Sequence, residues 1–169
     1  AISASGDEVA IGEKQKVGIW RVSTGKEIES LSVDGENLHS VVIFPDGRGV
    51  LVGLGNGVVD YRDLSGRTTV LGTLAGHTPV VSVSADAKWV AAIFTDVEVQ
   101  TSTLMVWQAA DWTRLHHQVF SGADLFFAQF AISLSPDGRT VATGGTGVDA
   151  LLIDVVDKRQ WRLEGNADG

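Results

Sequence analysis

The stretch that decides the fold is Ser135-Pro136-Asp137-Gly138-Arg139-Thr140-Val141-Ala142, because three other segments of the chain align with it. These segments are Ser3-Ala4-Ser5-Gly6-Asp7-Glu8-Val9-Ala10, Phe44-Pro45-Asp46-Gly47-Arg48-Gly49-Val50-Leu51 and Ser84-Ala85-Asp86-Ala87-Lys88-Trp89-Val90-Ala91. The shared turn positions, Gly6, Gly47, Ala87 and Gly138, lie 41, 40 and 51 residues apart. Self-similarity at such a period is typical of repeat architectures. The sequence therefore contains four copies of one unit, over about 1–34, 35–77, 78–123 and 124–169.

Each copy has the pattern of a small antiparallel sheet. Apolar runs flank a Pro-Asp-Gly-like turn, which predicts a β-hairpin, with turns near 4–7, 45–48, 84–88 and 136–139. About 14 residues after the turn position a third apolar run carries Trp20, Tyr61, Trp107 or Ile153 (the last is 15 residues on). A more polar fourth strand follows. We therefore expect an all-β fold with four antiparallel strands in each copy and almost no helix.

The inner strands indicate how the sheets are covered. Runs such as Val41–Phe44 and Leu151–Ile153 are continuously apolar, as expected when both faces of a sheet are buried. Short hairpin connections leave no room for crossover helices, so neighbouring sheets must supply the cover, as in the blades of a β-propeller. A β-sandwich of similar hairpins is the alternative, but it does not need four equal repeats.

The four copies are expected to form an incomplete ring. The first copy has only Ala1–Ser3 of an innermost strand, so the chain is interpreted as a cut from a larger polypeptide or as half of an assembled ring. Open sheet faces and unpaired edges favour association. Self-association that completes a propeller ring is therefore one expectation for the partners.

Several motifs resemble those of the WD40-repeat family. Gly76-His77 precedes Val106-Trp107 by about 30 residues, similar to the Gly-His and Trp-Asp ends of one WD40 repeat. Eroded versions of the second motif are Ile19-Trp20-Arg21, Asp60-Tyr61-Arg62 and Ile153-Asp154. The resemblance implies that His77, Asp96 and Trp107 share a buried, structural hydrogen-bond network. The chain departs from the family in having one Gly-His pair and no intact Trp-Asp pair.

Composition excludes several classes of partner. The 13 basic and 21 acidic residues give a net charge of −8, which disfavours binding to nucleic-acid phosphates. No apolar run reaches the roughly 18 residues of a membrane-spanning helix, so no membrane partner is expected. Cysteine is absent, which excludes disulfides and fits a cytoplasmic protein.

The sequence offers no catalytic, metal-binding or cofactor motif. It contains neither a phosphate-binding loop ending in Lys-Ser/Thr nor a Gly-x-Ser-x-Gly elbow. His116 and His117 are adjacent, so on a strand they point to opposite faces and cannot share a metal ion. The carboxylates Asp46, Asp86 and Asp137, and with them Asp7, are interpreted as turn-forming Asx residues.

These observations predict a non-catalytic protein–protein interaction scaffold. The alternative is the propeller domain of an enzyme, one that gates a hydrolase or cradles a cofactor. The third copy carries about six extra residues around Asp96–Thr103 and four or five around Val119–Gln129. In a four-stranded meander both insertions emerge at the same end of the sheet. The hypothesis is a partner-binding patch made of Glu98, Gln100, Phe120, Asp124 and Phe126, since aromatic anchors dominate interfaces.

Overall fold

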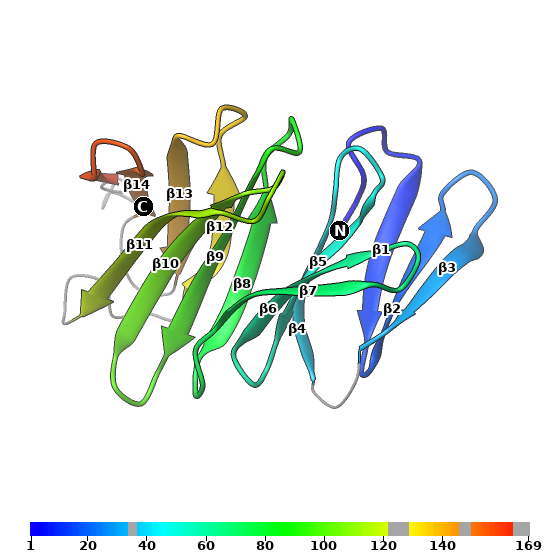
Figure 1. Cartoon of the computed structure of the whole chain (residues 1–169), viewed down its shortest axis with the longest axis horizontal. Coiled ribbons are helices and arrows are strands. Elements are labelled where there is room, and N and C mark those ends of the chain that lie inside the picture. Colours follow the sequence, from blue (N-terminus) through cyan, green and yellow to red (C-terminus); the bar gives the residue numbers. More distant parts are fainter. Residues whose placement is uncertain (34–36, 122–128, 146–149, 164–169) are drawn as a thin grey trace, which may run out of the picture.

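The protein is an all-β molecule built from four antiparallel sheets that stand side by side (Figure 1). The computed structural model describes residues 1–33, 37–121, 129–145 and 150–163, and these contain strands and no helix. Nothing in this described part is a helix able to span a membrane. The fold predicted from the repeats, consecutive blades of an incomplete β-propeller, is confirmed.

Each sheet is an up-and-down meander of strands that follow one another in the chain. The first holds β1 (Glu8–Glu13), β2 (Lys16–Arg21) and β3 (Lys26–Ser32), and the second holds β4 (Leu38–Ile43), β5 (Gly49–Leu54), β6 (Val58–Asp63) and β7 (Thr68–Thr73). The third holds β8 (Thr78–Val83), β9 (Trp89–Asp96), β10 (Thr101–Gln108) and β11 (Arg114–Ser121). The fourth holds β12 (Gln129–Leu134), β13 (Thr140–Gly145), β14 (Ala150–Asp154) and β15 (Arg159–Leu163).

The first sheet has a short segment in place of a full inner strand. Ile2 forms an isolated antiparallel bridge with Val9, and the backbones of Ala1 and Ala10 exchange two hydrogen bonds of 2.9 Å. Ala1–Ser3 therefore lies where β4, β8 and β12 lie in the other sheets, as the alignment of the copies predicts.

The turn between the first two strands of each copy is held by side-chain hydrogen bonds. In the third copy Ser84 Oγ accepts from Trp89 N at 2.9 Å and donates to Asp86 at 2.7 Å. The Asp86 carboxylate also accepts from Lys88 N at 3.1 Å, and Ala87 takes a left-handed φ of 60°. Glycine holds this left-handed position in the other three copies, because it adopts such a φ without steric cost.

The predicted equivalence of the turn carboxylates needs one correction. Ser135 and Asp137 repeat the geometry of Ser84 and Asp86, with a hydroxyl–carboxylate bond of 2.6 Å. In the first copy, however, Ser5 stands at this position and its Oγ accepts from Asp7 N at 3.2 Å. Asp7 lies two residues further on, because the turn is closed there by a hydroxyl and not by a carboxylate.

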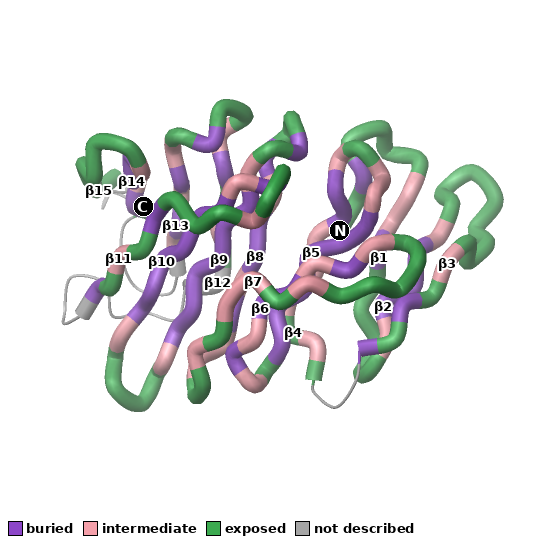
Figure 2. Tube along the Cα trace, in the orientation of Figure 1, coloured by how far each residue is buried: buried purple, intermediate pink, exposed green. Residues whose placement is uncertain are grey.

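Three apolar layers fill the spaces between the four sheets (Figure 2). The layer between the first and second sheets includes Val17, Val50 and Val52, and that between the third and fourth includes Ala91 and Ile153. The middle layer is the richest in large side chains: Phe44, Leu51, Phe94, Met105 and Trp107 are all buried there. Alternate residues of each inner strand face opposite layers, which explains why these strands are apolar throughout.

Strand register corrects which third-strand residues are equivalent. Four residues occupy the same place opposite the valine three positions after the turn residue, in the pairs Val9–Trp20, Val50–Arg62, Val90–Trp107 and Val141–Ile153. The second copy therefore matches the tryptophans with Arg62 and not with Tyr61. Counting 14 residues selected Tyr61 because the hairpins of the copies differ in length.

Candidate partner-binding surface

The third sheet is longer than its neighbours at one end. β9, β10 and β11 each have eight residues, whereas β5, β6 and β7 have six. Thr101 is paired with Asp96 on one side and Ser121 on the other. The predicted insertions thus lie side by side at the same end, but the described part forms longer strands and a turn over 97–100, and not a loop.

The turn at this end exposes apolar side chains. Val97 and Val99 are 60% and 65% exposed, and Val119 on the adjacent β11, opposite Thr103, is 57% exposed. We call Val97, Glu98, Val99, Gln100 and Val119 the third-sheet tip, at the lower edge of Figure 1. Three large aliphatic side chains exposed at one end of a sheet are what a contact surface offers to a partner.

The tip is held by its own hydrogen bonds and has an acidic character. Asp96 accepts from the backbone N–H groups of Glu98 at 2.9 Å and Val99 at 3.1 Å. Gln100 closes the turn with a left-handed φ of 58°, which few non-glycine residues adopt. Segment 94–104 contains two carboxylates and no Lys or Arg, so the valines are flanked by negative charge alone.

The structure places the predicted patch residues in different environments. Glu98 and Gln100 are exposed at the tip. Phe120 is only 6% exposed and belongs to the layer between the third and fourth sheets, with Leu134 and Val141. It is therefore a core residue and not a surface anchor, because the register of β11 turns its ring inward. Asp124 and Phe126 lie outside the described residues.

Sequence reasoning missed the three valines. A signal for two of them was present: Val97 and Val99 stand on either side of Glu98 in the connection between two strands, where β-branched residues are disfavoured. Val119 carried no signal of its own, because only the pairing of β10 with β11 places it beside the tip.

The three residues of the predicted hydrogen-bond network are only partly brought together. His77 Nδ1 lies 3.9 Å from an Asp96 carboxylate oxygen and 3.1 Å from Ala75 O. Trp107 is 1% exposed in the middle apolar layer, where its ring lies 3.2 Å from the position a Cβ on Gly72 would take. Among the described residues no hydrogen bond joins Trp107 to His77 or Asp96.

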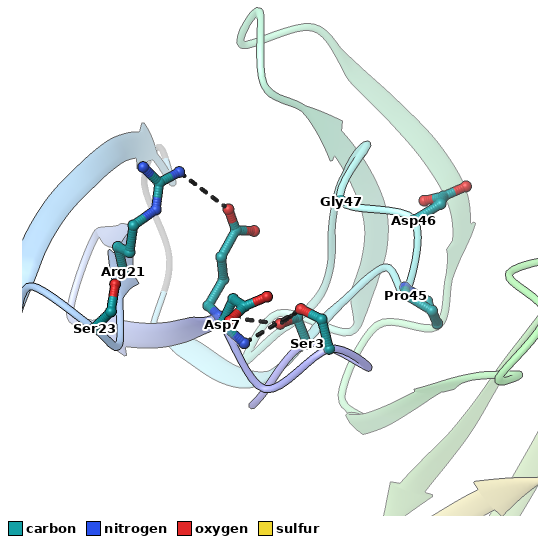
Figure 3. A pocket seen from close by; sticks show the side chains of 9 residues that line it. Ser3, Asp7, Arg21, Ser23, Pro45, Asp46 and Gly47 are labelled. Carbon is teal, nitrogen blue, oxygen red and sulfur yellow. Dashed lines mark hydrogen bonds and ion pairs between the residues drawn. The ribbon is translucent and has the colours of Figure 1, made fainter.

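A polar pocket at the opposite end of the molecule is the other concave candidate (Figure 3). It has a volume of about 470 Å³ and lies between the turns of the first two copies, with Arg21, Glu8, Ser3 and Asp46 among its lining residues. Arg21 lies 3.9 Å from Glu8, and Ser3 Oγ accepts from Glu8 N at 3.1 Å. These serine contacts are the bonds that hold the turn, and the described lining includes no histidine to activate a hydroxyl.

The adjacent histidines of β11 occupy opposite sides of the sheet. His116 is 4% exposed; its Nδ1 lies 3.0 Å from Val155 O and its Nε2 lies 3.2 Å from Gln118 Oε1. His117 is exposed. His116 thus connects the third sheet to the fourth, and no cluster of three metal-ligating side chains occurs within the described ranges.

Comparison with known proteins finds similarity of structure only. No protein-family model and no curated protein matches the sequence. Among solved structures, Kuenenia stuttgartiensis hydrazine synthase superposes with a TM-score of 0.74 at 17% sequence identity. The match covers 96% of this chain and 52% of that one, so this chain spans about half the length of the solved chain. At this identity the likeness establishes the fold and nothing about activity.

Proposed function

We propose that the chain is a non-catalytic protein–protein interaction scaffold, a divergent WD40-like propeller segment, and that a partner binds at the third-sheet tip. The observation that carries this proposal is the exposure of Val97 and Val99, at 60% and 65%, in a turn that Asp96 holds in place. Exposed aliphatic side chains on a rigid turn lose little conformational freedom on binding.

The chemistry of the tip suggests what the partner presents. The valines would contact an apolar surface, and the carboxylates of Asp96 and Glu98, without a basic residue in the turn, would favour Lys or Arg around that surface. Such charge complementarity steers association more than it adds affinity. A cytoplasmic location is part of the same proposal and fits a chain without cysteine.

The test compares proteins retained from an extract of the source organism by three immobilised chains. Val97→Ser with Val99→Ser should lose a partner that the unaltered chain retains, because the apolar contact is removed. Val22→Ser is the matched control, since Val22 is a comparably exposed valine (54%) in the turn after β2. If the tip variant retains the same proteins as the control, the tip does not bind a partner.

A further inference from the structure

Each space between sheets is filled by one row of paired residues from either side. The third sheet faces the fourth with the row Ser82, Ala91, Val106 and His116. The fourth sheet faces back with the row Leu134, Val141, Ile153 and Gln160. Ala91, Val106, Val141 and Ile153 belong to one buried cluster. We call these a forward row and a back row, named for the side on which the next or the preceding sheet lies.

The fourth sheet repeats the forward row of the third but leaves it open. Its row is Ser133, Ala142, Leu152 and Trp161, which matches the serine, the alanine, a branched aliphatic residue and a ring. The third-sheet row is at most 9% exposed, whereas Trp161 is 45% exposed. Ala131, Gly144 and Ala150 on the same face leave a shallow apolar depression of about 310 Å³.

The first sheet likewise has an open back row. It consists of Ile2, Val9, Trp20 and Glu27, and in the third sheet the same places hold Val83, Val90, Trp107 and Arg114. Trp107 is 1% exposed beneath the second sheet, whereas Trp20 is half-buried and Ile2 is 68% exposed. Trp20 thus stands where a preceding sheet covers its counterpart.

We infer that the forward row of the fourth sheet binds the back row of the first sheet in a second copy of this chain. Both faces repeat rows that already pack against each other inside the molecule, and the small residues of one face the large side chains of the other. Charge agrees: Arg159, on the same face as Trp161, has no ion pair among the described residues, and Glu27 ends the opposing row. This contact uses a surface different from the third-sheet tip.

Because the two faces differ, the contact is heterologous. Two copies that use both of their faces close into a ring, and a contact that does not close gives an open chain of copies. Sedimentation of the whole 169-residue chain over a range of concentrations should therefore give multiples of its 17.9 kDa mass. A mass of 17.9 kDa up to the solubility limit would overturn the inference.

Substitution of the row then locates the contact. Trp20→Glu places a charge in the interface and should raise the dissociation constant at least about tenfold, as expected for a central aromatic anchor. Val22→Glu is the control, because Val22 lies outside the row. Circular dichroism should show the same β content for both variants. Association of Trp20→Glu with unchanged affinity would show that the back row of the first sheet is not the contact.

Crosslinking distinguishes the proposed arrangement from a symmetric one. The chain has no cysteine, so Glu27→Cys and Trp161→Cys each introduce a single thiol. A thiol crosslinker of about 10 Å, the distance between stacked sheets, should join the two variants when they are mixed. Neither variant alone should form a linked dimer, since each contact then contains one thiol. Linked dimers of a single variant, or none in the mixture, would contradict the inference.

Discussion

The first and third sheets place the same residue at the same position in two environments. Trp107 is opposite Val90 and Trp20 is opposite Val9, yet Trp107 is buried beneath a neighbouring sheet and Trp20 lies on an open face. The third sheet also extends beyond its neighbours and exposes valines at its tip. The comparison shows that the repeat sets where a side chain points, whereas the neighbouring sheet decides whether that side chain stabilises the fold or remains free for contact.

The largest expected effect comes from truncating the two tryptophans. Trp107→Ala should lower the free energy of unfolding by about 3–5 kcal/mol, because it leaves a cavity in the middle apolar layer. Trp20→Ala should cost clearly less, since its ring is already partly in water. Urea denaturation of both variants, at a concentration where the chain is monomeric, measures the difference. Equal losses would remove the distinction between the two sheets.

The same position in the second sheet predicts a loss of similar size with a different chemical cause. Arg62 occupies it and forms a 3.0 Å ion pair with Asp60; the two residues are 8% and 2% exposed. Asp60→Ala should destabilise the fold by about 3 kcal/mol, because Arg62 is left as a buried charge without its carboxylate. The double variant Asp60→Val with Arg62→Met should recover much of this loss in the same urea assay. A double variant less stable than Asp60→Ala would show that the charge pair itself is required.

A smaller effect is expected from acid, and it should separate the turns of the third and first sheets. Burial acts to raise the pKa of Asp86, but the Ser84 hydroxyl and the Lys88 N–H outweigh it and hold that pKa below its usual value. A carboxylate with a depressed pKa contributes stability above its unfolded pKa, and this stability is lost as pH falls through the folded value.

Asp86→Asn should therefore flatten the loss of stability between about pH 5 and pH 2. The first sheet has Ser5 at this position, so Ser5→Ala should leave the slope with pH unchanged. The urea midpoint followed across this range measures both slopes. A steeper acid loss in Asp86→Asn than in the unaltered chain would refute the assignment.

The smallest change in stability is expected at the third-sheet tip. Val97→Ser with Val99→Ser should alter the free energy of unfolding by no more than about 0.5 kcal/mol per site, because both side chains are mainly in water. Thermal denaturation followed by circular dichroism is sufficient to measure this. A loss comparable to that of Trp107→Ala would mean that the valines support the fold and are not kept for contact.

The repeats predicted the sheets well because turn chemistry and apolar periodicity are local. The turns near 45–48 and 136–139 were placed correctly, since a Pro-Asp-Gly segment between apolar runs has few other conformations. The equivalence of Trp20 with Arg62 could not be found by counting residues, because hairpin length shifts the register while leaving both strands apolar.

The candidate site was predicted only in its location. Two insertions at one end of the sheet indicated where to look, and Glu98 and Gln100 do lie there. The side on which Phe120 points depends on its pairing with Ser102 across β10 and β11. A single-residue change in register would turn it to the other face, and the sequence alone does not determine that register.

Photocrosslinking tests most directly the claim that the third-sheet tip binds a protein partner. A photoreactive phenylalanine replaces Val99 in one chain and Val156 in another; Val156 is 66% exposed in the turn after β14. After irradiation in an extract of the source organism, the Val99 chain should form a discrete covalent adduct with one protein. The Val156 chain should not form that adduct, and addition of excess unlabelled chain should suppress it. The same adducts from both positions, or none from Val99, would contradict the proposed function.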